Sequence, residues 1–342
     1  MLDRFAARIR SSPDDSGVII KDGYVVKAWG DPAARVDWAS AGKSALSTML
    51  LFALKEGTLS SLDDPVIDWG WAVSTDPTER LQGEDRAITF RHLANMTSGF
   101  DRMEGPGEAY AYNDNAVQLY ARTLLRVFDA ETPQTAFNDA ALTPARLGPL
   151  EFEDGPVFGT TDPIQGGRAE TALVTSPRDF ARLGWLWLNR GHWRGAPLLP
   201  ESYFTRSAIP LVPNAMPLSV AAAGNYLLIG TWGNPVTFDM PFGPGLYGLH
   251  WWFNGLVGKT TRRHWPDAPL DTFAAIGNYP QKAMFVIPSL RMVVAAHGDW
   301  SGGSYDTPPL EGSRGQPHRY WDPGHPEGGL NEQLALLAAA VR

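Results

Sequence analysis

Segments with β-strand character stand at both ends of the chain, and helical patterns fill the region between them. Residues 17–30 form two β-rich runs joined by Asp22-Gly23, a pair that is the strongest short signal for a β-hairpin. Three further β-rich runs lie near the other end, at 272–277, 283–287 and 292–297. The simplest assembly pairs the N-terminal hairpin with these late strands in one antiparallel sheet.

Helical periodicity predicts the remaining elements. Patterns typical of helices cover the N-terminal stretch 1–12, with Leu2, Phe5, Ala6 and Ile9 on one face, and the segments 44–56, 88–96, 115–128, 176–189 and 331–342. The two terminal helices would cover one face of the sheet, and the middle helices would form a lobe of their own. The sequence therefore predicts an α/β fold of the α+β type: an antiparallel sheet from both chain ends, flanked by the terminal helices, plus a mostly helical lobe.

A single domain over 1–342 accommodates this pattern. The sheet lobe would comprise 1–55 and 245–342, and the helical lobe 56–244. Residues 208–247 are dense in Pro, Gly and Asn without clear periodicity, which is typical of a long connection. We expect this segment to form a flap, and we expect an active site between the two lobes.

Charge and composition exclude several classes of function. The chain carries 29 Lys and Arg against 37 Asp and Glu, a net charge of −8, and it contains no cysteine. Nucleic acids and acidic membranes attract basic surfaces, so neither is an expected partner. The absence of cysteine rules out disulfides, thiolate metal sites and a cysteine nucleophile.

No apolar stretch reaches the roughly 18 residues of a membrane span, and the first residues lack the apolar core of a signal peptide. We therefore expect a soluble protein, whose compartment and oligomeric state stay open.

Ser40 and Lys43 form an S-x-x-K sequence just before the predicted helix 44–56. Residues three apart share one face of a helix, so the hydroxyl and the amine can meet there. The helix N-terminus and burial both disfavour a cation and would lower the pKa of Lys43 toward the neutral base that a serine nucleophile needs. The backbone N–H of Ser40 could also stabilise an oxyanion. The alternative is that this common sequence only caps the helix.

Other types of site fit the sequence less well. Residues 42–44, Gly-Lys-Ser, match the end of a phosphate-binding loop, but Asp37 stands where the first glycine of that loop belongs. The seven histidines show no zinc-protease spacing, and no G-x-S-x-G nucleophile elbow is present. The sequence therefore predicts neither a metal nor a cofactor.

Several segments that follow the S-x-x-K sequence together carry a family resemblance. The matching residues are Gly57, Leu59, Leu62, Asp63, Asp64, Pro65 and Val66, followed by Ile88, Thr89, Arg91, Leu93, Thr97, Ser98 and Gly99. In this order they resemble the serine β-lactamase and penicillin-binding-protein-like hydrolases, and most closely the class C β-lactamase-related branch with its family VIII carboxylesterases. The similarity runs from about residue 17 to the C-terminal helix. It implies a serine hydrolase that forms an acyl-enzyme on Ser40.

The resemblance assigns the family's second motif, Y-x-N, to Tyr112 and the two residues after it. It implies that Tyr112 exchanges a proton with Ser40 and the leaving group, coupled to Lys43. Tyr110 is the competing choice. The third position is Asp114 instead of asparagine, and an ionised carboxylate can only accept hydrogen bonds. Asp114 could therefore hold Lys43 or a substrate amine.

The family's third motif, K-T-G or a relative, falls by the same resemblance on Ala275, Ile276 and Gly277. Asn278 would then supply the second oxyanion N–H, and Gly277 would let substrate approach the strand edge. Ala275 stands where the family has a cation for the carboxylate of a β-lactam. Its presence argues against β-lactams as the substrate.

The sequence thus predicts a metal-free serine hydrolase that acts on a small ester or amide through a Ser40 acyl-enzyme. Lys43 would be the general base and Tyr112 the general acid/base. Trp38 and Trp252 would line an apolar substrate pocket. The alternatives are a weak β-lactamase, a D-amino-acid peptidase, or a ligand-binding protein that has lost catalysis on the same fold.

Overall fold

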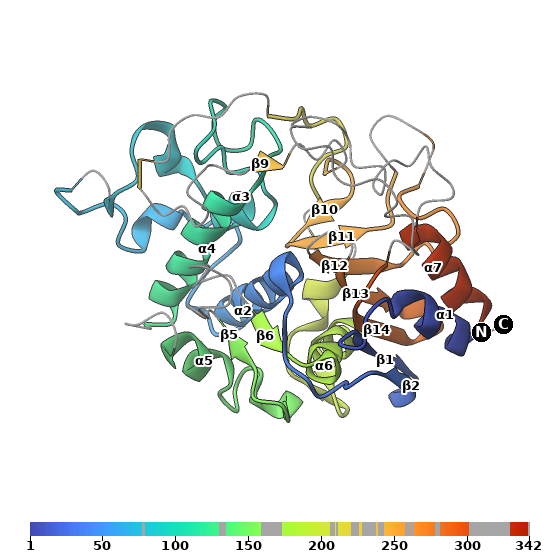
Figure 1. Ribbon diagram of the computed structural model, residues 1–342. Coiled ribbons are helices and arrows are strands. Elements are labelled where there is room, and N and C mark those ends of the chain that lie inside the picture. The colour runs from blue at the N-terminus through green and yellow to red at the C-terminus, as the bar shows by residue number, and fades with distance from the viewer. Residues whose placement is uncertain are drawn as a thin grey trace.

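A seven-stranded antiparallel sheet, with helices packed against it, dominates the fold (Figure 1). The structure is a computed structural model that describes residues 1–76, 79–129, 135–158, 173–205, 209, 211–219, 226–227, 237–238, 243–256, 261, 263–277, 281–300 and 329–340. Smaller helices and short strands form the rest of the described chain. The predicted α/β fold of the α+β type is confirmed.

Both ends of the chain contribute strands to the large sheet, whose order is β10-β11-β12-β13-β14-β1-β2. These strands are β1 (Ser16–Lys21), β2 (Tyr24–Trp29), β10 (Tyr247–Gly248), β11 (Trp251–Phe253), β12 (Phe273–Gly277), β13 (Lys282–Ile287) and β14 (Met292–His297). The β1–β2 hairpin turns at Asp22 and Gly23, whose φ angles of 52° and 88° suit a two-residue turn. β1 then pairs with β14, with Ser16 opposite His297. The predicted union of the N-terminal hairpin with the late strands is confirmed.

The helices of the described chain are α1 (Leu2–Ile9), α2 (Lys43–Lys55), α3 (Phe90–Ala94), α4 (Asp114–Val127), α5 (Thr135–Ala141), α6 (Pro177–Leu188) and α7 (Gly329–Ala339). α6 packs on one face of the large sheet and the terminal helices lie on the other, whereas α3, α4 and α5 lie beyond α2 (Figure 1). The terminal helices α1 and α7 lie side by side, and Arg8 pairs with Glu332 at 2.6 Å (Figure 1). α6 packs closely on the sheet through Gly184, where a Cβ would lie 2.7 Å from Met284 Sδ and 2.8 Å from Val293. Such close contact requires glycine at this point of the helix.

Short elements connect the sheet to the helices of the middle region. The 3-10 helices are η1 (Ala39–Gly42), η2 (Val66–Asp68), η4 (Gly83–Ala87), η5 (Gly148–Leu150), η7 (Glu201–Phe204) and η8 (Pro288–Leu290). The short strands pair as β3 (Val36–Asp37) with β6 (Leu173–Thr175), β6 with β5 (Val157–Phe158), β4 (Tyr112–Asn113) with β9 (Thr237–Phe238), and β7 (His192–Trp193) with β8 (Ala196–Pro197). Most of the predicted flap at 208–247 lies outside the described residues, and the division into two lobes stays a prediction.

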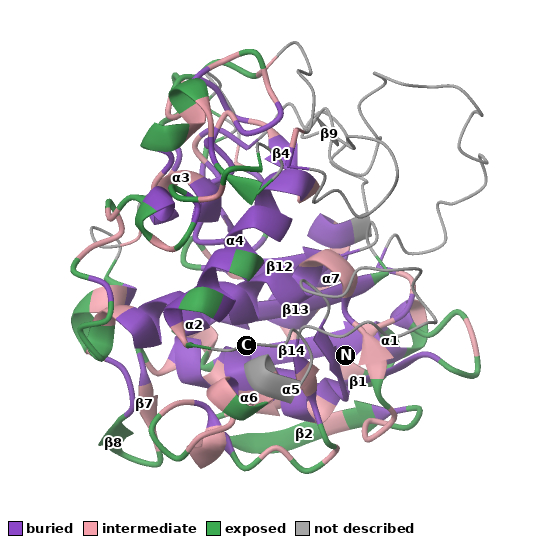
Figure 2. Ribbon diagram, turned by 90° about the vertical axis from the view of Figure 1, so that its left-hand side faces the viewer, coloured by how far each residue is buried: buried purple, intermediate pink, exposed green. Residues whose placement is uncertain are grey.

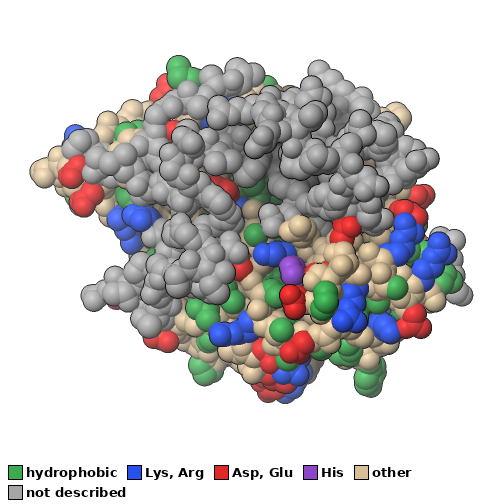
Figure 3. Space-filling view, in the orientation of Figure 1, with side chains coloured by type: hydrophobic (Ala, Val, Ile, Leu, Met, Phe, Trp, Pro, Cys, Tyr) green, Lys and Arg blue, Asp and Glu red, His purple; other side chains and the backbone are tan. Residues whose placement is uncertain are grey.

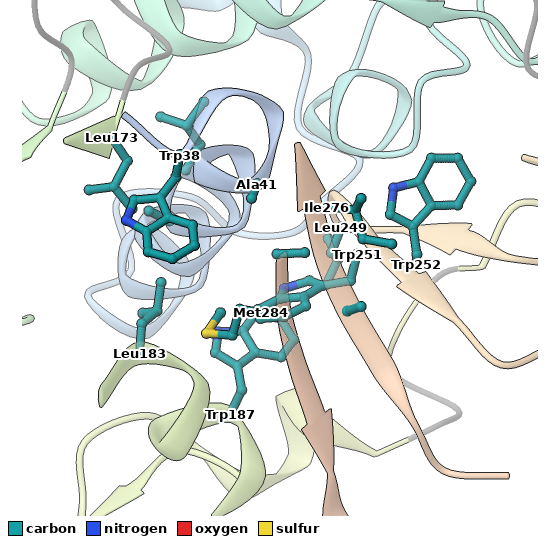
Figure 4. Packing of buried hydrophobic residues seen from close by; sticks show 14 of the residues in the cluster. Trp38, Ala41, Leu173, Leu183, Trp187, Leu249, Trp251, Trp252, Ile276 and Met284 are labelled. Carbon is teal, nitrogen blue, oxygen red and sulfur yellow. The ribbon is translucent and has the colours of Figure 1, made fainter. Parts of the chain in front are cut away.

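The first part of α2 lies inside the molecule, with every residue from Lys43 to Ala53 buried. Figure 2 shows the buried residues concentrated in the sheet and in the helices beside it. Trp38, Leu183 and Trp187 pack between α2, α6 and the strands in the apolar cluster of Figure 4. A helix enclosed in this way offers few places for a charge. A lysine at its first position therefore needs partners of its own.

Charged side chains of both signs are interspersed over the described part of the face seen in Figure 3. This distribution accompanies the net charge of −8. Within the ranges that the structure describes, no helix combines the length and the apolar character needed to cross a membrane.

Candidate active site

Ser40 lies in η1, and contacts from two neighbouring residues hold this turn in place. The Trp38 indole donates a hydrogen bond to the Thr175 carbonyl at 3.0 Å. Gly42 packs against β6, where a Cβ would lie 2.7 Å from the Cβ of Leu173. The turn therefore needs glycine at this position, and its fixed backbone sets the direction of the Ser40 side chain at the entry to α2.

Three oxygen atoms surround the amino group of Lys43, which is only 4% exposed. Its Nζ donates to Ser40 Oγ at 2.8 Å and to Tyr112 Oη at 3.2 Å. Asp114 Oδ1 lies 2.8 Å from the same nitrogen and forms an ion pair with it. An ammonium has three N–H groups and no lone pair, so this surrounding suits the protonated lysine.

The protonation of Lys43 departs from the expectation drawn from the sequence. Burial does lower the pKa of the Lys43 ammonium, but the Asp114 carboxylate and Tyr112 outweigh it, and the net pKa is raised above its ordinary value. The predicted shift toward a neutral amine is therefore wrong in sign. The reason is the carboxylate of Asp114, and its contact with Lys43 is one of the two roles that the sequence leaves open for this residue.

Tyr112 reaches Lys43 from the short strand β4. It is 2% exposed, and its ring stacks on that of Trp252 with centroids 6.1 Å apart and planes inclined by 15°. Tyr110, the competing choice, packs instead against Tyr247 with ring centroids 5.9 Å apart, and burial raises the pKa of its hydroxyl well above the usual value. The structure thus brings Tyr112, and not Tyr110, to the lysine.

Asp114 is the first residue of α4, and the residue before it fixes the start of that helix. Asn113 caps the helix, because its Oδ1 accepts hydrogen bonds from the backbone N–H groups of Asn115 at 2.9 Å and Ala116 at 3.2 Å. The side chain of Asp114 keeps 15% of its surface exposed, against 5% for that of Lys43. The carboxylate therefore stands at the more open side of the pair.

The end of β12 lies against the backbone that carries the serine. A Cβ on Gly277 would lie 3.0 Å from the backbone nitrogen of Ser40 and 2.8 Å from that of Ala41, so only glycine fits. Ala275 and Ile276, which precede it, are 1% and 4% exposed. This is the strand that the resemblance assigns to the third motif.

The predicted second oxyanion donor, Asn278, lies outside the described residues. The strand β12 ends at Gly277, one residue before it. Its role as an oxyanion donor stays a prediction.

The two tryptophans predicted to wall a pocket have different positions. Trp38 is fully buried, and its ring lies 4.4 Å from that of Phe180 in the core (Figure 4). Its assignment to a substrate pocket is therefore wrong, because the indole faces α6 and β6 instead of an opening. Trp252 is 2% exposed and supports the ring of Tyr112.

His250 is a neighbour of the site that sequence reasoning missed. It lies in the turn between β10 and β11, and its Nδ1 is hydrogen-bonded to Ser47 of α2 at 3.0 Å. Burial and the charge of Lys43 lower the pKa of His250 to about 3, so the ring is neutral at physiological pH. A contact between residues about 200 positions apart has no local signal in the sequence.

No three His, Asp or Glu side chains in the described parts of the chain come together in a way that could hold a metal ion. A cavity of about 290 Å³ lies near the other end of β12, walled by Trp187, Phe204, Phe253 and Phe273. It does not include Ser40, Lys43 or Tyr112. The chemically distinctive groups therefore gather elsewhere, at the junction of η1, α2, β4 and α4.

Fold and site together define a mixed α/β protein with a serine, a lysine and a tyrosine collected at the start of a buried helix. A family model described as Beta-lactamase matches residues 7–304, and the chain therefore belongs to the beta-lactamase family. This finding confirms the resemblance seen in the sequence.

Three solved structures illustrate the fold. A β-lactamase from Mycobacterium bovis superposes with a TM-score of 0.60 at 16% identity, covering 100% of this chain and 99% of its own. EstCE1, a hydrolase with promiscuous acyltransferase activity, gives 0.59 at 14% identity with 98% of each chain covered. An octameric penicillin-binding protein homologue from Pyrococcus abyssi gives 0.58 at 16% identity, covering 99% of this chain and 76% of its own. No curated protein sequence matches the chain.

Proposed function

We propose that the protein is a serine hydrolase that cleaves a small ester or amide through an acyl-enzyme on Ser40. One observation carries the proposal: Lys43 Nζ lies 2.8 Å from Ser40 Oγ and 3.2 Å from Tyr112 Oη inside a buried cluster. Such a contact gives a serine hydroxyl the neighbouring proton acceptor that it needs to become a nucleophile. Membership of the beta-lactamase family and the hydrolases among its structural neighbours support a hydrolase.

The reaction starts from the form of the cluster that has lost one proton. The Lys43–Tyr112 pair then takes the proton of Ser40, and Ser40 Oγ bonds to the substrate carbonyl carbon. The backbone N–H of Ser40, with Asn278 as the predicted second donor, stabilises the oxyanion. As the bond to the leaving group breaks, that group takes the proton through Tyr112. A water molecule then releases the acid in a second cycle of the same transfers.

The rise in the pKa of Lys43 gives this reaction a defined pH dependence. Because Lys43 rests in its protonated form, activity should rise as the pH increases toward the raised pKa of Lys43. A kcat/KM profile with an alkaline rise is the expected form.

β-Lactams fit the proposal less well than esters without a negative charge. Ala275 carries no charge at the first position of the third motif, and Asp114 adds a carboxylate beside Lys43. A missing charge-assisted hydrogen bond costs about 1.5–3 kcal/mol, or about ten- to a hundredfold in kcat/KM. We expect nitrocefin to fall below p-nitrophenyl butyrate by at least this factor. Turnover of nitrocefin at or above that of the ester would favour a β-lactamase instead.

Covalent labelling tests the nucleophile directly. A fluorophosphonate should add one adduct to the wild type, seen by intact-mass spectrometry, and none to Ser40→Ala. Ser44→Ala is the matched control, because Ser44 lies in the same buried stretch but only donates to the Ala41 carbonyl. It should label like the wild type. Labelling that persists in Ser40→Ala would overturn the assignment, and a wild type that neither labels nor turns over activated esters would favour the ligand-binding alternative.

A further inference from the structure

The carboxylate of Asp114 is only partly used by its neighbours. Its Oδ1 forms an ion pair with Lys43 at 2.8 Å. Among the residues that the structure describes, Lys43 is its one charged partner. A carboxylate offers about four acceptor positions, so Asp114 retains capacity for a second donor on its exposed side.

The position of Asp114 is close to the proposed reacting atom. Lys43 Nζ lies 2.8 Å from both Ser40 Oγ and Asp114 Oδ1, so the carboxylate is no more than two hydrogen-bond lengths from the nucleophile. A group that binds Asp114 therefore lies within a few bonds of a carbonyl carbon attached to Ser40. Asp114 is therefore within reach of a group on the acyl part of the substrate.

The charges around Lys43 come from several packed elements. Asp114 of α4 faces it with a negative charge, Tyr112 of β4 and Ser40 of η1 face it with hydroxyls, and His250 stays neutral. The positive charge of Lys43 and the negative charge of Asp114 therefore compensate each other. A positively charged group of a substrate would contact the Asp114 carboxylate. The carboxylate would then interact with two positive groups, this one and Lys43.

We propose that Asp114 selects esters or amides whose acyl part carries a protonated amine a few bonds from the scissile carbonyl. The inference rests on the proposed function and adds a substrate class to it. The bound ammonium group donates a hydrogen bond to Asp114. The Asp114 carboxylate then stabilises the protonated form of Lys43 less strongly. That proton then leaves to solvent at a lower pH, and the freed lysine can take the proton of Ser40. Substrate binding and activation of the base are coupled in this way.

Two isosteric esters test the proposal. β-Alanine phenyl ester and phenyl butyrate differ by an ammonium in place of a methyl group, and phenol release reports both reactions. With the wild type we expect kcat/KM to be about ten- to a hundredfold higher for the β-alanine ester, the range for a charge-assisted hydrogen bond. The alkaline rise of kcat should begin at lower pH for this ester than for phenyl butyrate, because kcat reports the groups of the enzyme–substrate complex. The preference should vanish once the pH exceeds the pKa of the substrate amine.

Asp114→Asn separates the role of the carboxylate from that of the fold. The preference for the amine should disappear in this variant, and phenyl butyrate should show its alkaline rise at lower pH than with the wild type. Asp63→Asn is the control, since Asp63 is an exposed carboxylate paired with Arg91. It should leave the preference and the pH profile unchanged.

Each outcome decides between the proposals. Equal rates for the two esters in a wild type that hydrolyses phenyl butyrate would overturn the role of Asp114 and leave the serine hydrolase intact. A preference that survives in Asp114→Asn would assign amine recognition to another group. A wild type that hydrolyses neither ester and resists labelling at Ser40 would remove both proposals. The wild-type comparison alone remains decisive if the variant does not fold.

Discussion

Two buried charged side chains, Lys43 and Asp179, differ in the kind of group that stabilises their charge. Lys43 at the start of α2 is surrounded by the side-chain oxygens of Ser40, Tyr112 and Asp114. Asp179 in the first turn of α6 is fully buried, and its carboxylate accepts backbone N–H groups of the loop at 153–154, at 2.8 to 3.0 Å. One charge is bound by groups that can exchange protons, and the other by groups that cannot.

This difference separates a site for chemistry from a site for folding. Backbone amides donate at fixed positions and keep their protons, so they fasten the loop 153–154 to α6. Hydroxyls and carboxylates can both bind and release protons, which suits a serine nucleophile. A buried ion pair is in itself weak evidence for stability. We therefore expect changes at Lys43 to affect the rate and changes at Asp179 to affect the fold.

The largest expected effect is the loss of rate in Lys43→Met. Removing the proton acceptor should lower kcat/KM by about a thousandfold or more, toward the upper end of what general acid–base catalysis contributes. Steady-state hydrolysis of p-nitrophenyl butyrate measures it. Lys55→Met, at the far end of the same helix, should retain full activity. If Lys43→Met kept its activity, the contrast between the two residues would be wrong, because Lys43 would then serve the fold, as Asp179 is expected to do.

Asp179→Ala should have the next largest effect, and on folding instead of rate. It leaves the partly buried N–H groups of Glu153 and Asp154 without their acceptor and removes the buried partner of Arg182, so the free energy of unfolding should fall by about 3 kcal/mol. Urea unfolding measures the loss. Asp179→Asn keeps one acceptor oxygen and should lose less. Folded Asp179→Ala that had also lost its catalytic rate would contradict the separation.

Acid should destabilise the protein through two buried histidines. Burial lowers the pKa of both His250 and His264 to about 3, from an ordinary value of 6.5. A lowered pKa means that each ring contributes stability above about pH 6.5, and this contribution is lost as the pH falls toward the folded value. Between pH 7 and pH 5 the loss should be about 2 kcal/mol for each ring.

Urea unfolding at the two pH values checks this expectation. His264→Phe keeps an aromatic ring against Trp265 and removes one of the two titrations, so the pH dependence should fall by about half. A pH dependence unchanged in this variant would mean that His264 is not the source. The comparison also shows whether His250, whose pKa is lowered by burial and by the charge of Lys43, behaves like His264, whose pKa is lowered by burial.

The smallest effect is expected for Ser47→Ala. Its hydroxyl pairs with His250 Nδ1 at 3.0 Å behind the catalytic cluster, and a neutral hydrogen bond contributes about 1 kcal/mol. Unfolding should become easier by this amount, while kcat/KM should stay within about threefold of the wild type. A large loss of rate would extend the catalytic cluster to His250.

Local patterns in the sequence predict a large part of this fold. The Asp22-Gly23 turn and the late β-rich runs predict the two-ended sheet, and helical spacing predicts α2 and α6. These signals succeed because turn chemistry and side-chain periodicity act over a few residues. The short β4–β9 pair carries no such signal.

The site was less accessible to sequence reasoning. The S-x-x-K spacing places Ser40 beside Lys43, and the family pattern points to Tyr112. The direction of the Lys43 pKa shift was missed because it depends on how closely Asp114 approaches, and that distance is set by the packing of α4 against α2. Trp38 was misassigned because adjacency in sequence does not reveal which way a side chain faces.

Because β1 pairs with β14, the large sheet can form only after β14 has been synthesised. A nascent chain that has emerged as far as α6 already contains Ser40, Lys43, Tyr112 and Asp114, but only the first hairpin of the seven-stranded sheet. A lone hairpin is marginal in water, and contacts between distant parts of a chain form late. The strand that presses Gly277 against the serine backbone is synthesised after all four of these residues. Growing chains and truncated fragments should therefore be inert, and they should depend on chaperones until the last strands arrive.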